Sequence, residues 1–293
     1  MITSIRRMTA SDLMLAFVLC IIAFFSISPI LHVLAVSLSE RVPVTSGKVL
    51  FLPVGLTFYN YMVIWDDPKF YRALWVSVER VILGGVVNFL LTVLMAFPLS
   101  RDPKIYRPRN AVMWFLIFVM IFNAGIVPWY LTIMKYGLLD SIWALVLPGA
   151  VPIFSIILLV NFFRSLPKDL DEACHMDGAG PWYMLFKIYI PLSLPSLATV
   201  TLFSIVGHWN SFFDGLVLMN TASNWPLQAY IQSLTVNLNG VMMDEDQAKL
   251  MSQLSITTLN SAKMIVAMIP IVIIYPFLQK YLIGGILLGA VKE

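Results

Sequence analysis

Six long apolar runs divide this sequence, and they restrict its fold more than any other feature. The runs cover about residues 13–38, 75–98, 111–133, 142–163, 192–218 and 261–283. About 20 apolar residues are enough to cross the hydrocarbon core of a bilayer as a helix. Because a backbone in lipid must satisfy its own hydrogen bonds, each run is predicted to be a transmembrane helix. The expected fold is therefore an all-α membrane protein with six spans, forming a single domain over residues 1–293.

The composition supports this interpretation and excludes others. The chain is 59% hydrophobic and only 12% charged, whereas soluble domains carry roughly 25% charged residues. The lipid bilayer is thus an expected partner. The net charge of +3 gives no electrostatic basis for binding nucleic acid. The three histidines lie far apart, and the two cysteines lie in different kinds of segment, so neither a metal site nor a disulfide is predicted.

Basic residues indicate the orientation, since cytoplasmic loops of membrane proteins are enriched in lysine and arginine. They are densest in the N-terminus, in the short link between the second and third runs, and in the segment that follows the fourth run. The residues concerned are Arg6, Arg7, Arg101, Lys104, Arg107, Arg109, Arg164, Lys168 and Lys187. Both termini and segment 164–191 are therefore predicted to be cytosolic, with outer loops at 39–74 and 219–260.

Segment 164–191 is a polar interval punctuated by glycine and proline. Acidic residues, Asp169, Asp171 and Glu172, favour the start of a helix through its dipole. Gly178 and Gly180-Pro181 are predicted to end this helix. A second helix is expected over about 181–189. The residues alone leave open whether this pair of helices binds a partner or is only a well-capped, solvated loop.

The same segment resembles the coupling loop of the membrane subunits of ABC importers, which reads Glu-Ala-Ala, three residues, Gly, and later Ile-x-Leu-Pro. Matching positions are Glu172, Ala173, Asp177, Gly178, Ala179, Ile188, Pro191 and Pro195. Cys174 and Ile190 depart from the pattern, as small or apolar replacements. The resemblance implies that an ATPase subunit contacts Glu172, Ala173, Cys174, Asp177, Gly178 and Ala179.

Other motifs are similar to the carbohydrate-uptake branch of type I importers, the maltose type. They are Asp140-Ser141, Trp209-Asn210 and the ending from Gln279 to Lys292. In that branch the C-terminal tail reaches the ATPase interface, which implicates Gly284, Gly285, Gly289 and Lys292. Residues 209–234 look like permeases for complex oligosaccharides, a group that includes the second permease of bacterial alginate importers.

This resemblance implies a permease subunit of an ATP-driven, binding-protein-dependent importer of carbohydrate, in the bacterial inner membrane. The implied partners are a homologous second permease, two ATPase subunits and an extracytoplasmic sugar-binding protein. The chain would bind no cofactor and would not be an enzyme, because ATP and Mg²⁺ would act on the ATPase. Consistently, the sequence has no Gly-x-x-x-x-Gly-Lys-Ser/Thr motif for nucleotide phosphates.

Polar residues within the apolar runs are candidates for the substrate path, since such residues are expensive in a membrane. Gly207, Asn210 and Asp214 are spaced three and four residues apart in the fifth run, so they are predicted to share one face of its helix. The predicted path residues are Asn210, Asp214, Trp209, Phe212 and Asn123. Their side chains could stack on a sugar or bond to it. An alternative role for the asparagines is bonding between helices, worth about 0.6 kcal/mol each.

Two other functions are weighed against the importer. A secondary transporter should show inverted halves and ion-binding carboxylates in broken helices, and neither is visible in the sequence. An intramembrane enzyme needs a nucleophile and base or metal ligands at depth, and His208 has no partner at helical spacing.

Overall fold

A computed structural model describes residues 10–167, 169–236 and 256–290 of the chain. In this part the chain is helical, with turns between the helices and one isolated antiparallel bridge between Ser39 and Leu56. The expectation of an all-α fold is confirmed. The chain divides into two compact units, which are described separately: residues 1–67 with 234–268, and residues 68–233 with 269–293.

The first unit contains α1 (Ala10–Ser37), α2 (Arg41–Thr45), α3 (Tyr59–Trp65) and the beginning of α16 (Ile256–Ala290). Buried polar contacts join these helices. Asn60 Nδ2 donates to the Ser37 carbonyl (2.9 Å), and Thr258 Oγ1 donates to Asn60 Oδ1 (3.0 Å). Lys263 Nζ forms an ion pair with Asp67 at 2.7 Å. These contacts fix the carboxyl end of α1 and the amino end of α16 to α3.

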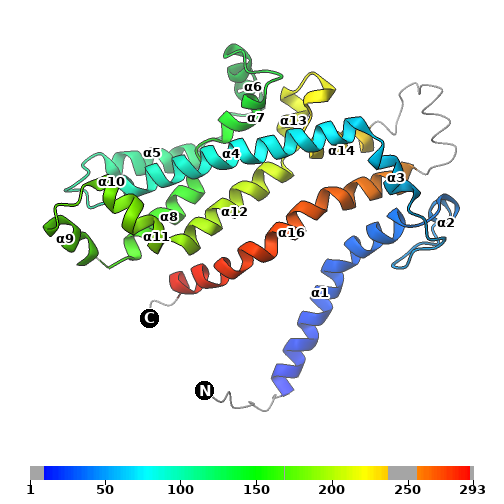
Figure 1. Cartoon of the computed structure of the whole chain (residues 1–293), viewed down its shortest axis with the longest axis horizontal. Coiled ribbons are helices and arrows are strands. Elements are labelled where there is room, and N and C mark those ends of the chain that lie inside the picture. Colours follow the sequence, from blue (N-terminus) through cyan, green and yellow to red (C-terminus); the bar gives the residue numbers. More distant parts are fainter. Residues whose placement is uncertain (1–9, 168, 237–255, 291–293) are drawn as a thin grey trace. The chain divides into compact units, whose positions relative to one another are not determined.

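The second unit is built on α4 (Pro68–Ser100), α8 (Ile153–Ser165) and α12 (Leu194–Asn210), which run side by side (Figure 1). Shorter helices complete it. They are α5 (Arg109–Ile121), α6 (Ile126–Lys135), α7 (Ile142–Val146) with its 3₁₀ turn η1 (Leu147–Gly149), α9 (Asp169–Met176), α10 (Pro181–Tyr183), the π-helical turn η2 (Met184–Tyr189), α11 (Ile190–Leu192), α13 (Phe213–Leu218), the 3₁₀ turn η3 (Ala222–Asn224) and α14 (Leu227–Val236).

Within the described residues, three helices are long and apolar enough to cross a membrane alone: α1, α4 and the Ile256–Pro276 part of α16. Three bent pairs pass the same test: α5 with α6, α7–η1 with α8, and the Pro181–Leu192 helix with α12. Their bends are 113°, 45° and 84°. Up to six spans result if each pair counts as one. The third pair covers residues 181–210 and so begins and ends earlier than the predicted run 192–218.

Local chemistry explains the breaks that the apolar pattern did not reveal. Gly125 has φ +84°, a left-handed conformation, and its N–H donates to Asn123 Oδ1 at 2.8 Å, which closes a turn between α5 and α6. Pro152 precedes α8 and cannot donate a helical hydrogen bond. The run predicted over 192–218 also splits, because α12 ends at Asn210 and α13 begins at Phe213.

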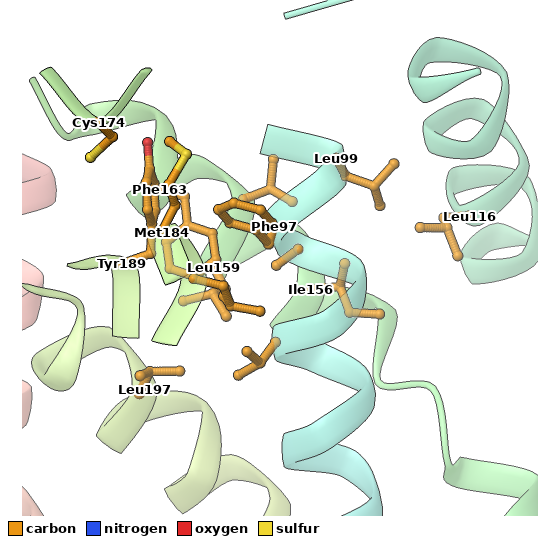
Figure 2. Packing of buried hydrophobic residues seen from close by; sticks show 14 residues of the cluster. Phe97, Leu99, Leu116, Ile156, Leu159, Phe163, Cys174, Met184, Tyr189 and Leu197 are labelled. Carbon is orange, nitrogen blue, oxygen red and sulfur yellow. The ribbon is translucent and has the colours of Figure 1, made fainter. Parts of the chain in front are cut away.

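In the second unit, an apolar cluster lies where the carboxyl end of α4 meets α8 and the amino end of α12. Ile156, Leu159 and Val160 of α8 have no exposed surface, and they pack with Phe97 of α4 and Leu197 of α12. Figure 2 shows Met184, Tyr189 and Cys174 joining the same cluster from the segment that follows α8. Burying each aliphatic side chain contributes about 1.5–3 kcal/mol. The cluster therefore fixes segment 164–191 onto the three long helices.

Candidate functional site

A cavity of about 610 Å³ lies among α4, the α7–η1–α8 pair, α12 and α13 in the second unit. Its aromatic lining comes from Trp129, Phe154 and Phe203. Its polar lining comes from both charged and neutral side chains: Arg80, Asn88, Ser155, Ser204, His208, Ser211 and Asp214. Aromatic faces beside hydrogen-bonding groups are suited to a polar ligand such as a saccharide.

Arg80 and Asp214 form the charged part of this cavity. Arg80 is only 3% exposed, its Nη1 donates to Asp214 Oδ1 at 3.1 Å, and its Nη2 bonds to Asp214 Oδ2. Asp214 Oδ1 also accepts from Ser211 Oγ (2.8 Å) and from the Gly215 N–H (2.9 Å). Arg80 Nη1 donates to the Ser211 carbonyl at 3.3 Å. The pair thus satisfies the backbone where the chain leaves α12.

Neutral polar groups form a second set at the same cavity. With its amide oxygen toward Ser204 Oγ (3.0 Å) and His208 Nε2 (3.2 Å), Asn88 donates to the carbonyl oxygens of Gly149 and Ala150 at 3.1 and 3.2 Å. One side chain thus links α4, α12 and the bend before α8. The close approach depends on Gly84, where an added Cβ would lie 2.4 Å from His208 Nε2.

The structure places the predicted path residues in different surroundings. Asp214 lines the cavity, but Asn210 is exposed at the last position of α12 and is not among the lining residues. Trp209 is 5% exposed and packs inside, while Phe212 is 41% exposed. Asn123 serves the turn between α5 and α6. The shared face expected for Gly207, Asn210 and Asp214 does not form, because the helix stops before Asp214.

Sequence reasoning did not identify Arg80 or the hydrogen bonds of Asn88 to Ser204 and His208. It also did not identify the aromatic pair Phe154 and Phe203, whose ring centroids lie 6.1 Å apart. A signal for Arg80 was present, because an arginine in an apolar run is a functional candidate by its cost alone. Nothing in the sequence distinguished Phe154 and Phe203 from other apolar residues in their runs.

Segment 164–191 forms the second candidate site. Helix α9 ends in a C-terminal turn where Gly178 has φ +70° and the Ala179 N–H donates to the Cys174 carbonyl at 2.9 Å. This bond, closed by a left-handed glycine, is the Schellman arrangement. The predicted end of the helix at Gly178 is therefore confirmed. The second helix begins at Pro181 as expected but continues through η2 to Leu192.

The six predicted ATPase-coupling residues divide between two faces. Glu172, Ala173, Asp177 and Gly178 are exposed, as is the neighbouring Met176 at 87%. Cys174 is 7% exposed and Ala179 packs against the same apolar cluster. Glu172 and Ala173 therefore lie on an exposed face of α9, with Asp177 and Gly178 exposed in the turn that follows, while Cys174 packs into the cluster. Of the predicted tail residues, Gly284, Gly285 and Gly289 lie in α16, and Lys292 lies outside the described residues.

Asp140 joins two loops of the second unit, the turn before α7 and the segment between α13 and η3. It has φ +61° and accepts from the Thr221 N–H (3.1 Å) and from Thr221 Oγ1 (2.5 Å). These bonds, the side-chain bond from Thr221 above all, hold the pKa of the Asp140 carboxyl below its usual value. The contact is therefore present above that usual pKa and is lost only as the pH falls through the lowered one.

Comparison with known proteins identifies the class of protein that carries these two sites. Residues 73–287 match the family described as binding-protein-dependent transport system inner membrane component. The chain belongs to this family. The permease is thus a membrane component of a transport system and not an enzyme, and the resemblance seen in the sequence is confirmed.

Individual relatives match the permease over almost its whole length. It is 35% identical to the polygalacturonan/rhamnogalacturonan transport system permease protein YtcP of Bacillus subtilis, covering 96% of this chain and 98% of YtcP. It is 34% identical to the protein LplC of the same organism, over 91% of this chain and 90% of LplC.

A solved structure matches the permease equally well. It is a chain of a bacterial ABC transporter involved in the import of the acidic polysaccharide alginate. That chain superposes with a TM-score of 0.86 at 33% identity, with 94% of the permease and 99% of the other chain covered.

Proposed function

We propose that this permease forms half of the translocation path of an ATP-driven importer of acidic oligosaccharides. The observation that carries the proposal is the full-length match to two proteins of acidic polysaccharide transport, YtcP and the alginate importer chain, at 35% and 33% identity. Permeases for neutral oligosaccharides are more distant relatives of this chain. AraQ, for arabinooligosaccharides, is 24% identical to it, and MelC, for melibiose, raffinose and stachyose, is 29% identical.

The cavity is the proposed sugar path of this half. Saccharides have hydroxyl groups that need hydrogen-bonding partners and apolar ring faces that stack on aromatic side chains. Asn88, Ser204 and His208 supply the first kind of group, and Trp129 and Phe203 supply the second. Asp214 remains in the proposed path, whereas Asn210, Trp209, Phe212 and Asn123 lie outside the cavity lining.

The proposed assembly contains a homologous second permease, two ATPase subunits and an extracytoplasmic sugar-binding protein. ATP and Mg²⁺ would bind to the ATPase subunits and no cofactor to this chain. The basic residues of the 101–109 link support a cytosolic position for this link, for both termini and for segment 164–191. The exposed face of α9 would then meet an ATPase, and loops 39–74 and 219–260 would meet the binding protein.

Energy would reach the cavity as movement of helices. Closure of the ATPase pair on ATP would displace α9, and rotation of the packed helices would open the cavity to one side of the membrane and then to the other. Such hinge or shear motion between packed elements is a common switching mechanism. Glu172, Ala173, Asp177 and Gly178 are the proposed contact residues because they are exposed.

The test is transport by the complete complex in proteoliposomes. Oligogalacturonides and alginate oligomers are compared with neutral maltooligosaccharides of equal length, in the presence of the binding protein. We expect ATP-dependent uptake, and stimulation of ATP hydrolysis, with the acidic sugars. Uptake of the neutral sugars alone would contradict the acidic class. Uphill uptake without the ATPase subunits would contradict the importer and favour a secondary transporter.

A further inference from the structure

A half-buried ion pair fastens α9 to the end of α4. Arg101 directly follows α4, and its Nη1 donates to both carboxylate oxygens of Asp171, each at 2.9 Å. The side chains of Arg101 and Asp171 are 11% and 31% exposed. Ser100 Oγ accepts from Arg101 Nε at 3.3 Å and from Nη2 at 3.1 Å. The guanidinium is therefore fixed at all three of its nitrogen atoms.

Aromatic rings hold the same ion pair from the cluster beneath it. The Tyr189 hydroxyl donates to Asp171 Oδ1 at 2.6 Å. The guanidinium carbon of Arg101 lies 4.3 Å from the centroid of the Tyr189 ring and 4.7 Å from that of Phe97, within the range of cation–π attraction. The Phe97 and Tyr189 rings meet edge to face at 5.2 Å. We refer to Arg101, Asp171, Tyr189 and Phe97 as the Arg101 clamp.

The clamp acts on the inner face of α9. Asp171 and Cys174 are three positions apart and so share one helix face, which Arg101 and the apolar cluster cover. Glu172, Ala173 and Met176 lie on the exposed face. Tyr189 is the last residue of the π-helical turn η2, a rare structure that is frequent at functional sites.

The middle of α4 reaches the cavity. Helix α4 is continuous from Pro68 to Ser100 and carries both Arg80 and Asn88. Since a helix rises about 1.5 Å per residue, Asn88 lies roughly 18 Å along the axis from Ser100. A displacement of the clamped end is thus passed to the cavity lining by a single helix.

We propose that the Arg101 clamp is the contact that transmits the displacement of α9 to α4 and so to the cavity. The inference rests on the proposed function, because an ATPase is what would move α9. Arg101, Asp171 and Tyr189 are positioning residues. They act through α4, and none of them lines the cavity.

The experiment measures saccharide moved per ATP hydrolysed by the complete complex in proteoliposomes. The variants are Arg101→Gln, Asp171→Asn and the two combined, with Lys104→Gln as a control that removes an exposed charge from the same link. We expect each single variant to keep hydrolysing ATP while uptake per ATP falls about fivefold or more, the lower end of ordinary coupling between sites. The double variant should be no worse than either single one.

Conservative variants separate positioning from folding. Arg101→Lys should move more saccharide per ATP than Arg101→Gln but less than the wild type, because a lysine lacks the planar fork that bonds a carboxylate. Tyr189→Phe keeps the ring and the ion pair and should give an intermediate ratio. If the Gln and Asn variants fail to assemble, these two still test the proposal.

Several results would overturn the clamp. One is an assembled Arg101→Gln complex with the wild-type ratio. Another is a lower yield of complex with an unchanged ratio, which is the result of a purely structural role. If the wild-type complex itself moves no saccharide, the proposed function fails, and the role of the clamp fails with it.

Discussion

At the scale of single residues, the second unit buries two opposite charges, one from α4 and one from α13. Arg80 is 3% exposed and the Asp214 side chain 17%. Such a pair adds little to stability when compared with a well-packed apolar pair, but removal of one partner leaves a charge without compensation. Arg80 and Asp214 are therefore expected to be strongly coupled.

Substitution of one partner tests this coupling. Asp214→Asn should destabilise the purified permease by about 3–5 kcal/mol, because Arg80 stays charged in a buried site. The double variant Arg80→Met/Asp214→Leu should be milder than Asp214→Asn alone. Thermal unfolding in detergent measures both. Equal losses for the single and double variants would show that the charge of Arg80 is not the cause.

Adjacent glycines of α4 provide a matched pair for the packing at His208. Gly84→Ala puts a methyl group 2.4 Å from His208 Nε2, whereas a Cβ at Gly85 meets nothing within 4 Å. Gly84→Ala should therefore cost about 1–3 kcal/mol through overpacking. Gly85→Ala should stabilise by up to about 1 kcal/mol, since glycine is unfavourable within a helix. Melting temperatures of the two variants should move in opposite directions.

At the scale of elements, the bend after α9 depends on one backbone conformation. Gly178 has φ +70°, whereas Gly180, two residues later, has φ −72°. A side chain is strained at the first position and not at the second.

Gly178→Leu should abolish saccharide uptake while the protein still inserts and accumulates in the membrane. Gly180→Ala should transport at a normal rate, because its backbone is extended and no atom lies within 4 Å of an added Cβ. Uptake assays, with immunoblots of membranes for protein amount, compare the two. Normal uptake by Gly178→Leu would contradict a role of this turn in coupling.

The apolar pattern predicted where helices lie but not where they bend. Run lengths follow from what a bilayer requires, so α1 and α4 appear close to their expected positions. The end of α12 instead depends on Arg80, which is distant in sequence and bonds to the Ser211 carbonyl at 3.3 Å. A periodicity argument within one run contains no such contact. The pattern therefore predicts that Asp214 shares a face with Gly207 and Asn210, whereas its partners in the structure are Arg80 and Ser211.

The structure of segment 164–191 was predicted more completely, since its signals are local. Acidic residues at its start and Gly178 at its end are properties of one short helix. Burial of Cys174 could not be read from the family pattern, because it depends on Phe163, Met184 and Tyr189 from other elements.

At the scale of the whole molecule, the proposed topology places the 101–109 link and loop 39–74 on opposite sides of the membrane. Single cysteines at Lys104 and Lys48, in a chain carrying Cys20→Ser and Cys174→Ser, provide a test. An impermeant thiol reagent added to intact spheroplasts should modify Lys48→Cys and spare Lys104→Cys. Inverted vesicles should give the reverse result. Labelling of both sites from the same side would contradict the topology.

Helix α1 exposes apolar side chains such as Phe17, Leu19 and Phe25 in all directions. The apolar exposure favours no particular rotation of α1 about its axis. Its sequence therefore has to preserve only hydrophobicity and length. Replacing the first turns of α1 by an unrelated apolar segment of equal length should leave the folding of the rest of the protein unchanged. The sequence of this stretch is therefore expected to vary among related proteins.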